Sequence, residues 1–123
     1  MVKENFFSRT EILVGRDGIE KLKNAKVAVL GLGGVGSFAA EALARAGIGE
    51  LILVDHDIIS PSNINRQIHA SCSTIGLHKV DVMKNRILDI NPCAKVIGIR
   101  EYYSENTAPD ILSGNFDYLV DAI

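Results

Sequence analysis

The chain has 123 residues, which suits one domain and is short for two. Its hydrophobic fraction of 47% and charged fraction of 23% are typical of globular proteins, and no uncharged run approaches the roughly 20 residues of a membrane-spanning helix. A formal net charge of -2 gives no global basic surface for nucleic acid. No signal-peptide pattern follows Met1, so we expect a soluble, cytoplasmic protein that does not enter a membrane.

The first part of the chain predicts a helical segment followed by a strand, a helix and a second strand. Residues 1–25 form the helical segment. Residues 26–30 are an apolar, β-branched run that stops at Gly31, which is typical of a strand buried on both faces. Helical spacing of apolar residues predicts a helix over 35–46, and a second apolar run predicts a strand over 51–54. A crossover of this length makes the two strands parallel.

The second part continues this alternation. A polar loop over residues 55–76 is longer than most connections, and long ordered loops are usually functional. A helix over 80–90, a strand over 95–99, a weak helical stretch and a strand over 116–123 follow. We therefore predict an α/β fold with a Rossmann-like, doubly wound and mostly parallel sheet.

The last predicted strand runs to the end of the chain. Helices cover both faces of a parallel sheet, and no residues remain here to form the next one. We therefore expect a sheet truncated after its fourth strand. In this interpretation residues 1–123 are the N-terminal part of one Rossmann-like domain, with a nucleotide-binding core over 26–123, and the C-terminal half is absent.

A glycine-rich turn lies between the first predicted strand and helix. Residues 31–36, Gly-Leu-Gly-Gly-Val-Gly, contain Gly-x-Gly-x-x-Gly in the context where backbone N–H groups at a helix N-terminus bind phosphate. Asp55 lies 19 residues after Gly36, at the end of the second strand, where a carboxylate can accept hydrogen bonds from ribose hydroxyls. The turn and the carboxylate together predict a nucleotide site. Its glycines are Gly31, Gly33, Gly34 and Gly36.

The loop after Asp55 bears on which nucleotide binds. Residues 62–67, Ser-Asn-Ile-Asn-Arg-Gln, supply Arg66, and Lys79 lies near the start of the next helix. Two fixed cations and Mg²⁺ suit the charge of ATP, whereas a nicotinamide dinucleotide carries only a pyrophosphate. An NAD-dependent oxidoreductase stays open as an alternative, because the glycine turn and Asp55 would serve it equally well.

These residues resemble the superfamily of ThiF, MoeB and ubiquitin-activating enzymes, which adenylate a carboxylate with ATP. The resemblance covers nearly the whole chain. It is carried by Ser8-Arg9, Gly15, the turn at 31–36, residues 46–49, residues 55–57, residues 62–67, Gly76 with Lys79, and Ile90-Asn91-Pro92. So many landmarks in one order indicate an ATP-binding domain of this superfamily.

The resemblance also implies roles for individual residues. Asp55 would hold the ribose, while Asn63, Arg66 and Lys79 would contact the phosphates and Gln67 would support their loop. Asp57 would lie near the phosphates and the metal, and Arg9 would reach the γ-phosphate of the neighbouring subunit in a homodimer. Arg66, Lys79 and Arg9 are therefore the expected catalytic residues.

Within the superfamily, residues 33–37, 40–49 and 65–70 are most similar to the tRNA threonylcarbamoyladenosine dehydratases. In that family ATP activates the carboxylate of a threonylcarbamoyl group on a tRNA adenosine, and loss of water closes a ring. The resemblance implies ATP and Mg²⁺ as cofactors and this tRNA as partner. The alternatives are an adenylyltransferase for a sulfur-carrier protein, as in MoeB and ThiF, and an inactive nucleotide-binding fragment.

The chain also departs from the superfamily pattern. The Mg²⁺-binding aspartate of the superfamily aligns to the position directly after Ile123, so we expect no metal ligand of that kind here and a strand-end role for Asp121. The zinc-binding cysteine pairs of MoeB-type members are absent from the sequence as well. We therefore expect the chain alone to be nearly inactive.

The histidines and cysteines form no pattern that predicts a site. His56, His69 and His78 lack the spacing of a helical metal-binding pair, so we expect loop or capping roles for them. Cys72 and Cys93 form no metal-binding motif and are expected to be free thiols.

Overall fold

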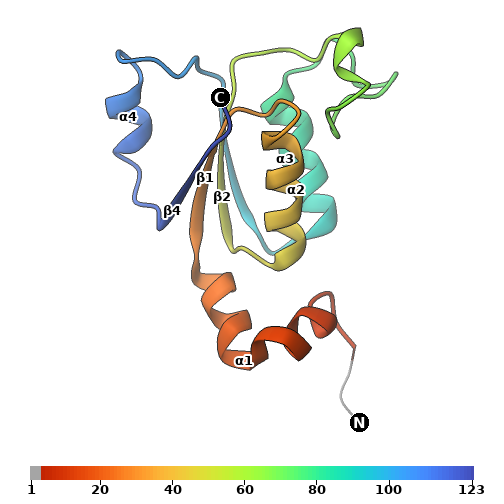
Figure 1. Cartoon of the computed structure of the whole chain (residues 1–123), viewed down its shortest axis with the longest axis vertical. Helices are drawn as coiled ribbons and strands as arrows, with labels where there is room; N and C mark the ends of the chain where they lie inside the picture. The colour runs from red at the N-terminus through yellow and green to blue at the C-terminus, as the bar shows by residue number, and fades with distance from the viewer. Residues whose placement is uncertain (1–3) are drawn as a thin grey trace.

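A four-stranded parallel sheet forms the centre of the computed structural model, which describes residues 4–123 (Figure 1). In spatial order the strands are β3 (Lys95–Ile99), β2 (Glu50–Val54), β1 (Lys26–Leu30) and β4 (Tyr118–Asp121). Each neighbouring pair is parallel, with Leu30 opposite both Val54 and Asp121. This order is that of a Rossmann-like sheet, which confirms the predicted fold class.

Two helices, α2 (Gly36–Ala46) and α3 (Lys79–Ile90), cover one face of the sheet (Figure 1). The apolar runs of β1 and β2 bury Val29 and Leu53 completely against this layer, where they meet Ala44 of α2 and Met83 and Ile87 of α3. Each large side chain buried in this way stabilises the fold by about 1.5–3 kcal/mol. This core fixes the strand ends from which the polar loops emerge.

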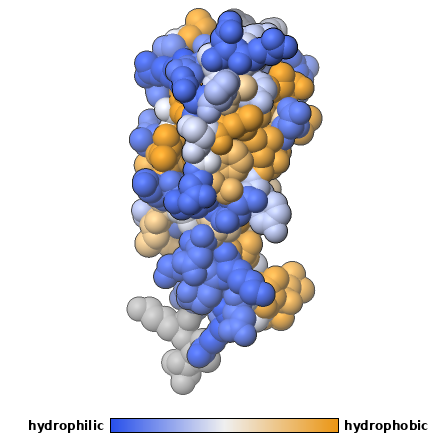
Figure 2. Space-filling view, turned by 90° about the vertical axis from the view of Figure 1, so that its left-hand side faces the viewer, coloured by the Kyte–Doolittle hydropathy of each residue, from blue (hydrophilic) through white to orange (hydrophobic). Residues whose placement is uncertain are grey.

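Within residues 4–123, the opposite face carries the short helix α4 (Ala108–Leu112) and the loops before and after it. Ile111 of α4 packs there against Leu30 and Ile52, in a smaller apolar cluster. Figure 2 faces this side of the molecule and shows hydrophobic surface between hydrophilic regions, and both Leu112 and Leu119 are exposed. Helices on both faces agree with a doubly wound sheet, although the two layers differ in size.

The helix α1 (Ser8–Asn24) lies beyond the amino ends of the strands (Figure 1). It agrees with the predicted helical segment over 1–25, of which residues 1–3 fall outside the described part. The helix is kinked at Gly15, whose φ of 73° lies in the left-handed region that favours glycine. Between residues 4 and 123, no helix is long and apolar enough to cross a membrane.

The predicted strand over 116–123 is too long, because β4 covers only Tyr118–Asp121. At its start, Phe116 packs into the smaller apolar cluster, and the Asp117 carboxylate accepts a hydrogen bond from Lys26 N at 2.9 Å. At its end, the neighbouring strand β1 stops at Leu30 and turns away, so no extended partner remains beyond Asp121.

Candidate nucleotide-binding site

A cavity of about 190 Å³ opens at the carboxyl ends of the strands. In open α/β sheets, ligands bind in the crevice outside these ends. Its walls come from the glycine turn, the end of β2, the start of α3 and the loops after β3 and β4. The lining residues used below are Gly31, Gly33, Asp55, Asp57, Lys79 and Tyr102.

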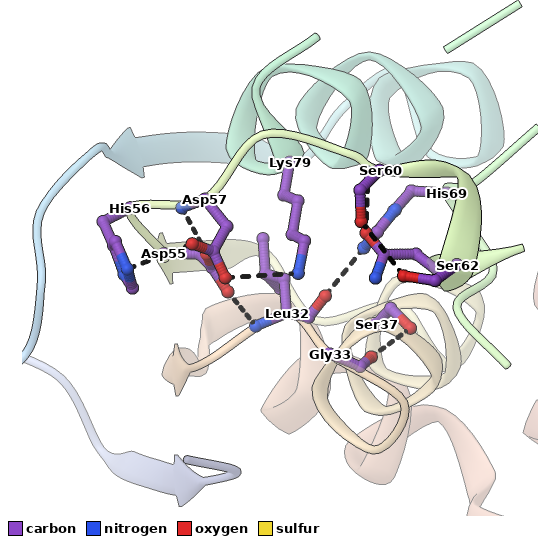
Figure 3. Close-up of polar contacts among 11 residues, drawn as sticks. Leu32, Gly33, Ser37, Asp55, His56, Asp57, Ser60, Ser62, His69 and Lys79 are labelled. Atoms are coloured by element: carbon purple, nitrogen blue, oxygen red, sulfur yellow. Dashed lines mark hydrogen bonds and ion pairs between the residues drawn. The ribbon is translucent and has the colours of Figure 1, made fainter. Parts of the chain in front are cut away.

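Asp55 follows directly after β2 and connects the end of that strand to the glycine turn. Its Oδ2 accepts a hydrogen bond from Leu32 N at 2.7 Å, and its Oδ1 accepts one from Asp57 N at 2.8 Å (Figure 3). A carboxylate has about four lone-pair sites, so acceptor capacity remains for hydroxyl groups. The side chain is therefore fixed at the cavity edge and able to accept further hydrogen bonds.

Lys79 is the first residue of α3, and its side chain reaches the cavity although the residue is only 5% exposed. Its Nζ lies 3.6 Å from Asp57 Oδ2, which makes an ion pair but exceeds hydrogen-bond distance. Within residues 4–123 this ammonium donates no hydrogen bond. The other oxygen of its partner, Asp57 Oδ1, pairs with His56 Nε2 at 3.0 Å. The side chain extends toward Asp57 and the glycine turn (Figure 3), and a cation on the cavity wall with donors free for a ligand suits an anion.

The glycine turn contains two glycines that the fold itself requires. A Cβ on Gly36 would lie 1.7 Å from the Gly31 carbonyl oxygen, and a Cβ on Gly31, whose φ is 89°, would lie 2.8 Å from the Ala122 oxygen. Gly33 is different, because the nearest atom to its Cβ position is Gln67 Nε2 at 3.9 Å. The space over Gly33 therefore leaves room for a ligand to approach the backbone.

The remaining predicted residues of the crossover loop (residues 55–78) do not line this cavity. Arg66 is exposed, and its Nη1 donates to Ser62 O at 3.1 Å and to Asn65 Oδ1 at 2.9 Å. Asn63 is buried in the short 3₁₀ helix Pro61–Asn63. Its Oδ1 accepts a hydrogen bond from Ser60 N at 2.8 Å. Gln67, 6% exposed, lies between this loop and the glycine turn.

The other two predicted glycines and Arg9 are placed as follows. Gly34 contacts the aliphatic part of Arg66, whose Cγ lies 3.4 Å from the Cβ position of Gly34. Gly36 begins α2, directly behind the turn. Arg9 is exposed on α1, at the opposite end of the sheet from the cavity (Figure 1). Within one chain, the structure does not bring Arg9 to the other site residues.

Sequence patterns did not identify several residues that shape the site. His69 lies in the crossover loop, as expected, but it is 2% exposed and its Nε2 lies 2.7 Å from Leu32 O. Ser37, fully buried, donates its hydroxyl to Gly33 O at 2.6 Å. Tyr102 lines the cavity and contacts the His56 ring edge-on. Only its place after β3, at the same sheet edge as Asp55, could have indicated Tyr102. Cys72 and Cys93 are free, as expected.

The sequence matches a known protein family over most of its length. Residues 7–123 match the model of the ThiF family. The chain belongs to the ThiF family. This membership confirms the superfamily resemblance.

Relatives of this ThiF-family chain include tRNA threonylcarbamoyladenosine dehydratases. Those of Bacillus subtilis and Escherichia coli are 54% and 41% identical over 94% and 95% of the chain. The molybdopterin-synthase adenylyltransferase of Salmonella typhimurium is 37% identical over 89% of it. The chain is thus more similar to these dehydratases than to that adenylyltransferase, as the sequence predicted.

Solved structures agree with this similarity. The crystal structure of the Escherichia coli dehydratase TcdA in complex with ATP matches the whole chain with a TM-score of 0.94 at 38% identity. A complex of the same enzyme with AMP matches equally well. The chain spans about half the length of these relatives, namely 46% and 44% of the two curated dehydratases and 52% of the ATP complex.

Proposed function

We propose that this chain is the ATP-binding part of an enzyme that activates a carboxylate with ATP. The observation that carries the proposal is Lys79, a largely buried side chain whose ammonium makes no hydrogen bond to residues 4–123 and lies on the wall of a cavity between the glycine turn and Asp55. A bound polyanion would accept hydrogen bonds from this ammonium. The likeness to a structure of TcdA in complex with ATP supports ATP as that polyanion.

In this proposal each side of the cavity binds one part of the nucleotide. Asp55 holds the ribose hydroxyls with its remaining lone pairs. The backbone at Gly33 and the Lys79 ammonium bind phosphate oxygens. The exposed guanidinium of Arg66 is held only by uncharged oxygens, so it can turn towards a phosphate at little cost. Asn63 joins it from the same loop, which Gln67 supports.

The complete protein, we propose, dehydrates threonylcarbamoyladenosine in tRNA in the cytoplasm. The carboxylate of the modified adenosine attacks the α-phosphate of ATP, pyrophosphate leaves, and release of AMP accompanies ring closure. This first step needs no side-chain nucleophile. The protein contributes by holding the carboxylate in line with the α-phosphate and by neutralising phosphate charge, which are the main sources of catalysis in such transfers.

Mg²⁺ accompanies ATP in this proposal, and the donors present fit it in part. Mg²⁺ usually binds one or two carboxylates together with substrate phosphates and waters. Donor atoms of Asp55, His56 and Asp57 lie within 4.8 Å of one another, and the Asp57 carboxylate is half-exposed at the cavity. Asp57 would therefore hold the ion beside the phosphates, and the ion would supply further charge neutralisation.

Arg9 enters the proposal only through a second copy of the protein. It lies at the far end of the sheet from its own cavity (Figure 1). A γ-phosphate contact by Arg9 therefore requires a homodimer in which α1 of one subunit reaches the cavity of the other.

The test supplies the complete protein with ATP and either tRNA carrying threonylcarbamoyladenosine or a sulfur-carrier protein that ends in Gly-Gly. We expect AMP and cyclised tRNA from the first mixture, and no adenylate on the carrier. Adenylation of the carrier with no reaction of the tRNA would overturn the substrate and favour the adenylyltransferase alternative. Preferential binding of NAD over ATP, unaffected by Arg66→Ala, would overturn the ATP site and favour an oxidoreductase.

A further inference from the structure

The peptide groups of the glycine turn are held by three side chains from outside the turn. Leu32 N donates to Asp55 from the end of β2, and Leu32 O accepts from His69 in the crossover loop. The next carbonyl, that of Gly33, accepts from the hydroxyl of Ser37 in α2 at 2.6 Å and from its backbone N at 3.1 Å. Figure 3 shows these contacts converging on Leu32 and Gly33. The orientations of three successive peptide planes, from Gly31–Leu32 to Gly33–Gly34, are therefore fixed from outside the turn.

The contact between His69 and Leu32 determines where the ring carries its proton. A carbonyl oxygen only accepts hydrogen bonds, so Nε2 must be the protonated nitrogen. Nδ1 is buried and has no partner within the described part of the chain. A second proton there would be buried without an acceptor, which is unfavourable. His69 is therefore a neutral ring with a fixed N–H donor.

The same contact determines the direction of the next N–H group. In a trans peptide the C=O and N–H bonds point in opposite directions, and no peptide bond between residues 4 and 123 is cis. Since the Leu32 carbonyl points at His69, which does not line the cavity, the Gly33 N–H points the opposite way, and Gly33 does line it. This N–H donates no hydrogen bond to residues 4–123.

We propose that His69 is a positioning residue for nucleotide binding, which holds the Leu32 carbonyl so that the Gly33 N–H faces the cavity and donates to a phosphate oxygen. The inference rests on the proposed function, because it takes the ligand of the cavity to be a nucleoside triphosphate. It assigns His69 no contact with the nucleotide. Its effect passes through one peptide plane, so it acts on the phosphates and leaves the base and ribose contacts alone.

The test compares His69→Phe, which keeps the ring shape and removes the donor, with His69→Gln, which keeps an N–H donor at similar reach. Calorimetry measures the binding of ATP and of adenosine, which lacks phosphates, to the complete protein and to each variant. Loss of one hydrogen bond corresponds to about a tenfold change in affinity. We expect His69→Phe to weaken ATP binding by about this factor while adenosine binding stays within about twofold, and His69→Gln to restore ATP binding.

Other outcomes would overturn the inference. Equal weakening of ATP and adenosine by His69→Phe would indicate only a packing role, and so would failure of His69→Gln to restore ATP binding. Unchanged ATP binding in His69→Phe would remove any role for His69.

A ligand-free measurement separates this inference from the proposed function. Nitrogen NMR of the wild-type protein should show His69 protonated at Nε2 and unprotonated at Nδ1 at neutral pH. The opposite tautomer would overturn the role of His69 and leave the ATP site intact. Absence of ATP binding by the wild-type protein would overturn the proposed function, and with it the phosphate contact proposed for Gly33.

Discussion

On the face of the sheet covered by α2 and α3, side chains fill the interior and the buried carboxylate of Glu41 is paired, whereas at the carboxyl edge polar groups surround an open cavity. On the helix-covered face, Glu41 of α2 pairs with Arg86 of α3 and with Arg45 of its own helix. At the carboxyl edge, Lys79 is equally buried but has only a long contact with Asp57. Charged groups within a stable fold are normally hydrogen-bonded, and a bound anion, as in the proposed function, would supply the hydrogen bonds that Lys79 lacks.

The glycine turn allows the sharpest test of this difference, because Gly36 begins α2 and Gly33 lines the cavity. A Cβ at position 36 would overlap the Gly31 carbonyl, so we expect Gly36→Ala to lower the free energy of unfolding by about 3 kcal/mol or to prevent folding. At position 33 the φ is negative and no atom lies within van der Waals overlap, so Gly33→Ala should change stability by less than about 0.5 kcal/mol.

ATP titration of the complete protein measures how Gly33→Ala changes the affinity for the nucleotide. The methyl group of Gly33→Ala would occupy the space through which a phosphate approaches, and we expect ATP affinity to fall at least about tenfold. A Gly33→Ala protein that unfolds as readily as Gly36→Ala would show that both glycines serve packing. Wild-type ATP affinity in Gly33→Ala would show that the phosphates bind elsewhere.

The charge at the edge of the cavity provides the second test. Lys79→Met keeps the length and burial of the side chain and removes the ammonium. Loss of charge-assisted hydrogen bonds to phosphate should weaken ATP binding by roughly 10–100-fold. Stability should be unchanged or higher by about 1 kcal/mol, because a buried cation with incomplete hydrogen bonding is costly in the free protein. Urea unfolding and ATP titration measure the two quantities, and Lys84→Met, on the exposed side of the same helix, is the matched control.

The third test addresses the satisfied charge on the helix-covered face. Arg86 donates hydrogen bonds to Glu41 and lowers the pKa of that carboxyl below its ordinary value of 4.5. The contribution of the Glu41–Arg86 pair to stability is therefore complete above pH 4.5 and is lost as the pH falls through the folded-state pKa of Glu41. We expect Glu41→Gln to lower the free energy of unfolding by about 2 kcal/mol at neutral pH, with no effect on ATP affinity.

Urea unfolding at neutral and acidic pH checks this expectation. The difference between Glu41→Gln and wild type should shrink below pH 4.5. Arg45→Gln is the control, because its exposed guanidinium should contribute less than about 0.5 kcal/mol. A difference between wild type and Glu41→Gln that is the same at both pH values would show that shape, and not charge, accounts for the loss.

Local patterns were sufficient to predict most of the fold. The apolar runs of β1 and β2 and the helical spacing of α2 depend on neighbours a few residues apart, so their boundaries agree with the structure within one residue. The end of β4 was wrong because it depends on where β1 stops, which is information from a distant part of the chain.

The same distinction applies to the candidate site. Asp55, Lys79 and the glycines belong to known motifs and lie at the cavity or directly behind it. His69 belongs to no spacing pattern, because its partner Leu32 is 37 residues away and the contact forms only when the crossover loop folds back. Arg66 and Asn63 belong to the motif but lie outside the cavity wall, since each already has partners in its own loop.

The smallest expected effect concerns His69, which makes the stability of the protein depend on pH. Burial, aided by the Lys79 charge, lowers the pKa of its ring below the ordinary 6.5, and the Leu32 carbonyl and Asp55 oppose this only in part. The unfolded chain therefore takes up a proton from about pH 6.5 downward while the folded protein does not, so the free energy of unfolding falls with pH in that window.

His69→Gln cannot titrate, and we expect wild type to lose up to about 1 kcal/mol more than this variant between neutral pH and about pH 5.5. Urea unfolding of both proteins across that range isolates the contribution of His69, because the two proteins differ at this position alone. Parallel stability curves would mean that the ring accepts a second proton without cost, and the rigid donor to Leu32 would then not be neutral.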